Sequence, residues 1–265
     1  MRTVAIIQAR MGSTRLPGKV LLPIMGKPML WHIVHRMQTA RRIEAIVVAT
    51  STNPADNKIA DFAGQHGLQC FRGSEHDVLD RYYQAAKEFR ADAVVRITGD
   101  CPFVDPELVS CLIEMYEQGS YDHVGIAAGA GAIFMDGGRF PDGLDAECFR
   151  FAALERAWRE ATEAGDREHV TPYLWRVAGR FRTGLLKAER DYSHLRWTVD
   201  TEADLCLVRQ VYEALYTEGS VFLMADILSF LDNHPDLGTA NQGLIGKEGY
   251  MQVWYPVIGS EGICE

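Results

Sequence analysis

A loop rich in basic residues follows the first apolar segment of the chain, and its residue types suit anion binding. Residues 8–19 read QARMGSTRLPGK and contain Arg10, Arg15 and Lys19 with two glycines and two hydroxyl side chains. Glycines let backbone N–H groups approach an anion, while arginine and lysine supply the counter-charge. The loop is not a P-loop, because valine follows Lys19, and it is not a G-x-G-x-x-G turn. We interpret it as a phosphate-binding loop; a solvated basic loop is the alternative.

Two further segments place a carboxylate directly after an apolar run. Asp100 follows residues 93–97 in RITGDCP, and Asp200 follows residues 196–199 in RWTVDTEAD. Two carboxylates from separate strand ends can hold one Mg²⁺ against substrate phosphates, the usual binding mode of that ion. A plain turn before proline is the alternative for Asp100, and a helix-start acid is the alternative for Asp200. Thr201 and Asp204 are spaced as a capping box, which leaves Asp200 available for another role.

Alternating apolar and helical segments must position these residues. The pattern predicts strands at residues 4–7, 46–50, 68–71, 93–97, 182–186 and 196–199, and helices at 28–40, 56–66, 76–89, from 105, 149–163 and 201–216. Continuous apolar strands separated by helices predict a mostly parallel sheet covered on both faces, a three-layer α/β/α sandwich. Ligands of such sheets bind at the carboxyl ends of the strands, so we expect the three candidate segments to meet there.

A range at about 119–180, Gly-rich and less periodic over residues 119–147, interrupts this pattern within a single predicted domain, 1–265. It is either a hairpin-bearing insertion or a substrate loop, and it contains FPDGLDAE (140–147) and EHVTPY (168–173). Asp142, Asp145 and Glu147 are candidates to line an acceptor pocket, with an acidic turn as the alternative. His169 is a candidate substrate contact, and a structural or interface histidine is equally compatible with the pattern. No element is predicted after about Asn233.

Composition narrows the classes of function. The net charge of -9 disfavours nucleic-acid binding, because a polyanion would be repelled. No apolar run approaches the roughly 20 residues that cross a bilayer, and the amino terminus lacks the features of a signal peptide. Six cysteines are scattered without a C-x-x-C pair, which predicts reduced thiols rather than a zinc site or disulfides. A cytoplasmic protein is therefore expected.

The run AIIQARMGSTRLPGKVL resembles the signature loop of the cytidylyltransferases that make CMP-activated acidic sugars, such as the CMP-Kdo and CMP-sialate synthetases. More narrowly, it is similar to the spore coat polysaccharide biosynthesis protein F type, and FPDGLDAE and EHVTPY are typical of that group. The resemblance covers residues 1 to about 215. It implies the nucleotide-diphospho-sugar transferase fold and a homodimer, with the range 119–180 supplying an acceptor lid and a dimer contact. It also implies these CTP contacts: Ala9, Arg10, Gly12, Ser13, Arg15, Lys19, Thr98, Gly99 and Asp100.

The resemblance further implies a Mg²⁺ cofactor on Asp100 and Asp200. Where sialate synthetases carry D-x-D, this chain has Asp200-Thr201-Glu202, so the second ligand and the number of metals stay open. The implied reaction transfers CMP from CTP to an acidic sugar or related small metabolite in the synthesis of cell-surface polysaccharide precursors. Arg10, Arg15 and Lys19 would neutralise the leaving pyrophosphate.

Three points stay open on the sequence. The general base is unassigned, with Asp200 or a metal-bound water as candidates. A glycosyltransferase with a nucleotide-sugar donor is one alternative function, although it usually carries a D-x-D motif that is not evident here. A nucleotide-binding protein without catalysis is the other. The acceptor is not identified, and selectivity for cytosine rests on the resemblance alone.

Overall fold

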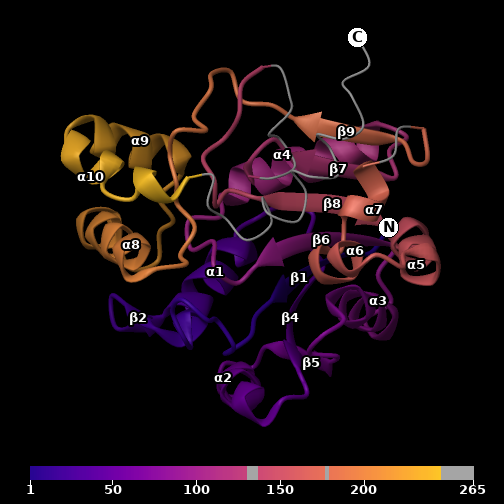
Figure 1. The fold of residues 1–265 in the computed structure, drawn as a ribbon. Helices are drawn as coiled ribbons and strands as arrows, with labels where there is room; N and C mark the ends of the chain where they lie inside the picture. Colours follow the sequence, from indigo (N-terminus) through magenta and orange to yellow (C-terminus); the bar gives the residue numbers. More distant parts are fainter. Residues whose placement is uncertain (130–136, 177–178, 246–265) are drawn as a thin grey trace.

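Seven strands form the central sheet of the computed structural model, which describes residues 1–129, 137–176 and 179–245 (Figure 1). Their order across the sheet is β5-β4-β1-β6-β8-β7-β9. All run parallel except β8, which is antiparallel to both neighbours, so the predicted, mostly parallel sheet is confirmed. The strands are β1 (Thr3–Gln8), β4 (Ala45–Ser51), β5 (Gln69–Gly73), β6 (Ala93–Thr98), β7 (His123–Ile126), β8 (Ala146–Arg150) and β9 (Thr183–Leu186).

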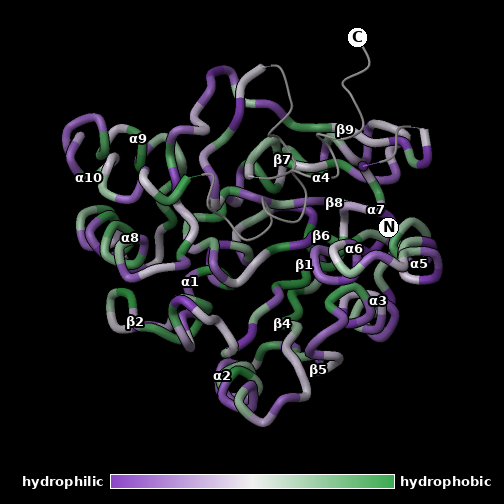
Figure 2. The backbone as a smooth tube through the Cα atoms, viewed as in Figure 1, coloured by the Kyte–Doolittle hydropathy of each residue, from purple (hydrophilic) through white to green (hydrophobic). Residues whose placement is uncertain are grey.

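Helices cover both faces of this sheet. Ala5 and Ile7 of β1 pack with residues of α1 (Met29–Gln38), α2 (Asn57–Gln65), α4 (Pro106–Gln118), α8 (Glu202–Leu215) and α9 (Met224–Asp232). Val4 and Ile6 point to the opposite face, because side chains alternate along a strand. There they pack with α3 (Val78–Glu88), α5 (Phe151–Glu160) and α7 (Pro172–Trp175). Figure 2 shows hydrophobic residues concentrated along the inner strands. The predicted three-layer sandwich is confirmed.

Capping residues begin the helices where the sequence indicates. The Asp105 carboxylate accepts hydrogen bonds from the backbone N–H groups of Glu107 and Leu108, and Pro106 is the first residue of α4. Thr201 and Asp204 form the predicted capping box at the start of α8. The predicted helix at 149–163 begins later, at Phe151, because its first two residues belong to β8.

The predicted strand at residues 196–199 is wrong. Only an isolated bridge joins Arg196 to Asp142 in this segment. The Trp197 N–H donates to the Asp142 carbonyl at 2.6 Å, whereas the Val199 N–H donates to the Asp100 carbonyl at 2.8 Å. The segment is extended and forms hydrogen bonds to two different loops. Its apolar pattern therefore reflects burial and not pairing with a neighbouring strand.

The range 119–180 contributes to the central sheet itself. It contains β7 and β8, then α5, α6 (Ala164–His169) and α7, while residues 130–136 and 177–178 lie outside the described residues. Its predicted roles as acceptor lid and dimer contact stay predictions.

Smaller elements complete the fold. They are η1 (Lys19–Leu21), β2 (Pro23–Ile24), β3 (Lys27–Pro28), η2 (Pro54–Asp56), α10 (Pro235–Thr239) and η4 (Gln242–Leu244), of which the last two lie where no element is predicted. Within the described ranges, no helix combines the length and apolar character needed to span a membrane. The five cysteines in those ranges are free thiols, and Cys264 lies outside them.

Candidate active site

The basic loop after β1 has a backbone held by hydrogen bonds. The Met11 N–H donates to Asp56 Oδ1 at 2.7 Å, and the Gly18 N–H donates to the Met11 carbonyl at 3.0 Å. Gly18 adopts a φ of 72°, which favours glycine, and the 3₁₀ turn η1 begins at the next residue. The closed turn therefore brings Lys19 back to the carboxyl edge of the sheet.

Lys19 joins the two predicted carboxylates. Its Nζ lies 2.8 Å from Asp100 Oδ2, 2.9 Å from Asp200 Oδ1 and 2.8 Å from the Val199 carbonyl oxygen. Burial alone would lower the pKa of Lys19, but the charges of the two carboxylates outweigh it and raise the pKa. For Asp100, burial alone would raise the pKa, but the nearby Lys19 ammonium lowers it to about 2. Residues from three distant segments thus form one charged cluster.

Asp200 is engaged through both of its oxygens. In addition to Lys19 on Oδ1, its Oδ2 forms an ion pair with Arg15 Nη2 at 3.0 Å and accepts a hydrogen bond from Arg196 Nη2 at 2.7 Å. The Arg196 side chain is fully buried and also pairs with Asp142 at 2.8 Å and with Asp204 at 3.2 Å. Three cations therefore surround Asp200. A carboxylate held in this way anchors the three cations around it.

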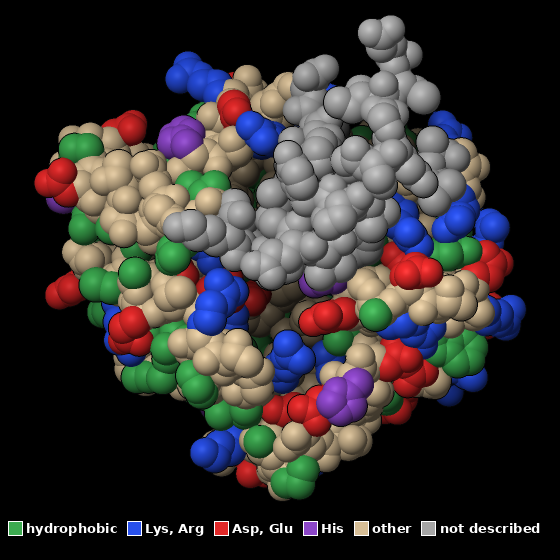
Figure 3. Space-filling model, viewed as in Figure 1, with side chains coloured by type: hydrophobic (Ala, Val, Ile, Leu, Met, Phe, Trp, Pro, Cys, Tyr) green, Lys and Arg blue, Asp and Glu red, His purple; other side chains and the backbone are tan. Residues whose placement is uncertain are grey.

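Two adjoining cavities open beside this cluster. The smaller, about 260 Å³, is lined by every residue predicted to contact the nucleotide: Ala9, Arg10, Gly12, Ser13, Arg15, Lys19, Thr98, Gly99 and Asp100. The larger, about 630 Å³, is lined by the four predicted acceptor residues: Asp142, Asp145, Glu147 and His169. Both cavities touch Arg15, Asp100 and Asp200. Figure 3 shows acidic and basic side chains gathered around a hollow on this face.

Close packing explains Gly99 between the two cavities. A Cβ at this position would lie 2.7 Å from the Gln8 carbonyl oxygen, which already accepts the Gly99 N–H at 2.8 Å. The close approach of the two strand ends requires glycine here. It places Asp100 directly opposite the basic loop.

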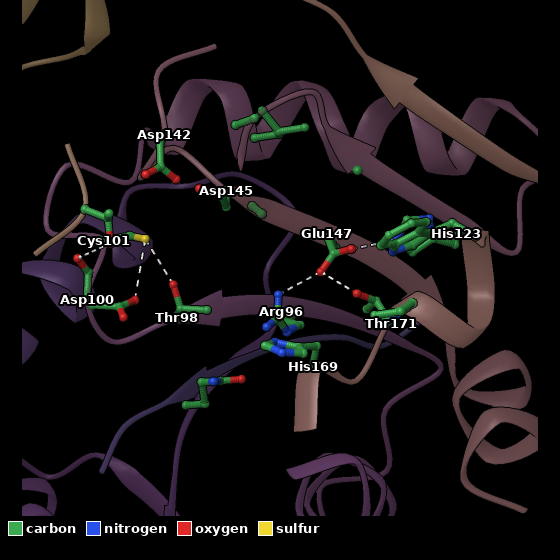
Figure 4. Close-up of a pocket in the computed structure, with 18 of the residues that line it drawn as sticks. Arg96, Thr98, Asp100, Cys101, His123, Asp142, Asp145, Glu147, His169 and Thr171 are labelled. Atoms are coloured by element: carbon green, nitrogen blue, oxygen red, sulfur yellow. Dashed lines mark hydrogen bonds and ion pairs between the residues drawn. The ribbon is translucent and has the colours of Figure 1, made fainter. Parts of the chain in front are cut away.

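Glu147 organises the inner end of the larger cavity (Figure 4). Its carboxylate accepts hydrogen bonds from Arg96 Nη1 at 2.8 Å and Thr171 Oγ1 at 3.0 Å, and His123 Nε2 lies 3.0 Å away. Burial would raise the pKa of Glu147, but the His123 hydrogen bond and the Arg96 charge lower it to about 2. His169 lies beside Arg96, and burial lowers the pKa of this histidine. Glu147 is therefore a charged carboxylate that holds its neighbours in place.

Asp145 lies two residues before Glu147 and has a different environment. Its Oδ2 accepts the Gly143 N–H at 2.8 Å. Gly143 has a φ of 99°, and a Cβ there would lie 2.4 Å from the Thr198 nitrogen, so only glycine fits the turn. Burial raises the pKa of Asp145 to about 6, against the Gly143 hydrogen bond and with the help of the Glu147 charge.

The donor set fits a magnesium ion held by two carboxylates. Asp100 and Asp200 converge on a single cation, the Lys19 ammonium, at the border of the two cavities. Magnesium is usually bound through one or two carboxylates together with waters and substrate phosphates. The described residues contain no group of three or more histidine, cysteine or acidic side chains that could hold a metal alone. Glu202 is mostly exposed and lies 3.9 Å from Arg209, away from both cavities.

Sequence reasoning missed several residues of the site. Arg96, His123, Thr171 and Trp175 line the larger cavity, and the buried Arg81 of α3 lines the smaller. Arg96 had a usable signal, since an arginine inside an apolar strand is rarely buried without a partner. The others carry no signal, because their positions depend on how α3, β7 and α7 pack.

Comparisons with known proteins agree with this geometry. The chain is 32% identical over 246 residues to the spore coat polysaccharide biosynthesis protein SpsF of Bacillus subtilis, covering 89% of this chain and 97% of that protein. It is 38% identical over 118 residues to the 3-deoxy-manno-octulosonate cytidylyltransferase of Trichlorobacter lovleyi, covering 44% of this chain and 45% of that protein. The structure of a cytidylyltransferase from Leptospira borgpetersenii superimposes with a TM-score of 0.81 at 30% identity, covering 90% of this chain and 97% of that one.

A family model described as cytidylyltransferase matches residues 4–223. This range includes the basic loop, both cavities and the segment that carries Asp200. The resemblance drawn from the loop motif is confirmed. The chain belongs to the cytidylyltransferase family of nucleotidyltransferases.

Proposed function

We propose that this protein transfers CMP from CTP to a hydroxyl group of a small acidic sugar or related metabolite, with Mg²⁺, and releases pyrophosphate. The observation that carries the proposal is the convergence of Arg15 and Lys19 on Asp100 and Asp200 at the border of two cavities. A nucleotide in one cavity and an acceptor in the other would meet at this border. In-line transfer to phosphorus needs such positioning and charge stabilisation more than covalent catalysis.

The smaller cavity suits the triphosphate. Arg10 is exposed and forms no ion pair within the described residues, so its guanidinium is available for a phosphate. Arg15 and Lys19 add two positive charges that would stabilise the pyrophosphate as it leaves. Asp100 and Asp200 would hold Mg²⁺, which would supply further positive charge to the phosphates.

The larger cavity suits a small polar acceptor. Arg96 and His169 offer sites for a negatively charged group, while Asp142, Asp145 and Glu147 offer acceptors for hydroxyl groups. The printed names of two relatives, a spore coat polysaccharide biosynthesis protein and a 3-deoxy-manno-octulosonate cytidylyltransferase, support an acidic sugar and a role in polysaccharide precursor synthesis. We also expect a cytoplasmic homodimer, which analytical ultracentrifugation and cell fractionation would test.

A pyrophosphate-release assay tests the proposal. Each of the four nucleoside triphosphates is supplied with Mg²⁺ and a panel of acceptors, among them 3-deoxy-manno-octulosonate, other acidic sugars and polyol phosphates. Release with CTP and one acceptor supports the proposal, and the CMP conjugate is identified by mass spectrometry. No release with any pairing, together with tight binding of an intact nucleotide sugar, would favour glycosyl transfer instead.

Arg15→Ala adds a test of the phosphate contacts. A charge-assisted hydrogen bond contributes about 1.5–3 kcal/mol, so kcat/KM for CTP should fall by about 10- to 150-fold. Arg159→Ala is the matched control, because Arg159 is an exposed residue of α5 paired only with Glu155 among the described residues. Equal kinetics for the two variants would remove Arg15 from the proposed site.

A further inference from the structure

Resting on the proposed transfer to a hydroxyl, we propose that Asp145 is the general base of the reaction. Its carboxylate takes the proton of the acceptor hydroxyl as that oxygen attacks the α-phosphorus of CTP. The new O–P bond forms while the bond from the α-phosphorus to the oxygen bridging to the β-phosphorus breaks. Pyrophosphate leaves with that electron pair, and the proton on Asp145 then passes to solvent.

Four of the five other carboxylates that line the cavity pair with cations, and the fifth, Glu168, is exposed on α6. Asp100 and Asp200 pair with Lys19, and Glu147 accepts hydrogen bonds from Arg96 and Thr171. Asp142 pairs with the buried Arg196 at 2.8 Å. Among them, Asp100 and Glu147 have lowered pKa values, so these two carboxylates are weak proton acceptors.

Asp145 differs from them in its contacts. Its Oδ2 accepts the Gly143 N–H, and no side chain within the described ranges pairs with it. Asp145 lines the larger cavity and the residue is half-buried. Its Oδ1 lies against Gly129, where a Cβ would be 2.4 Å away. A base needs an oxygen within hydrogen-bond reach of the substrate proton, and Asp145 is the carboxylate of this cavity wall that no cation holds among the described residues.

Strand register places Asp145 at the junction of the two cavities. In the antiparallel pair of β6 and β8, Arg96 lies opposite Glu147 and Ile97 lies opposite Ala146. Continuing this register sets Asp145 beside Thr98, two residues before Asp100. Figure 4 shows Asp145 between Asp142 and Glu147. An acceptor that contacts both Glu147 and the phosphate end therefore passes in front of Asp145.

The surroundings of Asp145 favour a pKa closer to neutral pH than that of an ordinary aspartate. Glu147 and Asp142 lie on its own segment, while Arg96, Asp100 and Cys101 face it from β6 and the following loop, and His169 lies beyond Arg96 on α6. Burial raises the pKa of Asp145 to about 6, and the negative charge of Glu147 contributes to the same direction. A base with a pKa just below the working pH is largely deprotonated and still binds the substrate proton strongly enough to drive its transfer.

The assignment also narrows the class of acceptor. A phosphate or carboxylate oxygen is already anionic at neutral pH and needs no base to attack phosphorus. A neutral hydroxyl must lose its proton, so a base beside the reaction centre indicates an alcohol as the nucleophile. The acid group of the acceptor would then help to bind the acceptor in the cavity, while the hydroxyl oxygen forms the new bond to phosphorus.

Asp145→Asn provides the test, with Asp191→Asn as the control because Asp191 is half exposed and pairs with Arg139 away from both cavities. Pyrophosphate release is followed from pH 5 to 9 with CTP, Mg²⁺ and 3-deoxy-manno-octulosonate, and also without acceptor, where water is the nucleophile. We expect kcat to fall by about 10²–10⁴-fold in Asp145→Asn, with the KM for CTP changed by less than about threefold. The acidic limb of the wild-type rate profile should disappear in the variant.

Chemical rescue separates a base from a merely structural group. Asp145→Ala leaves space for a small acid, so added formate should restore part of the rate, while chloride should not. Two outcomes would overturn the base assignment and leave the proposed function standing. In the first, the wild type is active and the kcat of Asp145→Asn lies within twofold of it. In the second, Asp145→Asn is slow but its rate profile keeps the acidic limb. A wild-type protein that binds CTP but releases no pyrophosphate in either arm would overturn the proposed function and this inference with it.

Discussion

Replacing Lys19 by methionine removes the cation that joins the two carboxylates of the nucleotide site. The Lys19 side chain is only 10% exposed, and its Nζ lies 2.8 Å from Asp100 and 2.9 Å from Asp200. At an effective dielectric constant of about 20, each contact is worth about 6 kcal/mol of gross Coulomb attraction. Desolvation offsets much of this gain. Removing one partner of a buried pair still costs about 3–5 kcal/mol, because Asp100 is left without its cation, while Asp200 keeps Arg15 and Arg196.

Urea unfolding at pH 7, followed by tryptophan fluorescence, measures this cost. We expect the free energy of unfolding of Lys19→Met to fall by about 3–5 kcal/mol. Arg41→Met is the control, because Arg41 lies 2.7 Å from Glu107 and both side chains are about half exposed (52% and 49%). An exposed pair contributes at most about 1 kcal/mol. The comparison therefore isolates burial as the cause, since the distances in the two pairs are alike.

Magnesium supplies a second measurement on the same variants. A divalent cation can pair with Asp100 and Asp200 once the ammonium is gone, so added Mg²⁺ should stabilise Lys19→Met more than the wild type. Arg41→Met should respond as the wild type does. A loss of stability below about 1 kcal/mol in Lys19→Met would refute the reasoning, because it would mean that the two carboxylates tolerate each other without the ammonium.

Two further predictions concern the turn that carries Asp145. Gly143→Ala should lower the thermal unfolding midpoint more than Gly219→Ala, because both glycines have positive φ (99° and 82°) but a Cβ clashes only at Gly143; equal shifts would contradict the clash argument. For Asp145→Asn, the sign follows from a folded-state pKa of about 6, above the ordinary value of 3.8. The native state keeps a proton that the unfolded chain releases, so stability falls as pH rises from about 4 to 6. The variant should therefore match the wild type near pH 4 and exceed it by up to about 3 kcal/mol at pH 7.5 in urea titrations. If the free energies of unfolding of the variant and the wild type differed by the same amount at every pH, the raised pKa of Asp145 would not be the cause of the difference.

Much of the architecture was predictable from local pattern. Continuous apolar runs such as residues 93–97 mark buried parallel strands, and Asp105-Pro106 and Thr201 mark helix starts, because those residues satisfy backbone N–H groups locally. The strand predicted at residues 196–199 failed for a physical reason. Burial of Trp197 and Val199 gives the same apolar pattern whether the backbone bonds to a neighbouring strand or to loops.

The acceptor end of the site was less predictable. Asp142, Asp145 and Glu147 look alike in the sequence, yet one pairs with Arg196, one is nearly unpartnered and one holds Arg96. The Glu147 contact arises from the pairing of β6 with β8, which sets Arg96 opposite Glu147, whereas the Asp142 contact comes from the bridge to Arg196. His123 joins the same cluster through β7, and nothing in its neighbouring residues indicates that. The nucleotide loop was readable because its chemistry lies in one continuous segment.

The place of β8 has a consequence for how the protein assembles and diversifies. β8 follows β7 in the chain but lies between β7 and β6 in the sheet, so within the sheet β8 joins β7 and β9 to the other strands. A folding intermediate with β8 unpaired can keep the phosphate loop on β1, β4 and β6 and yet lack a wall for the second substrate. Under the proposed function, the same division would let the cavity wall on β7, β8 and β9 change the choice of acceptor while residues 8–19 keep the triphosphate contacts.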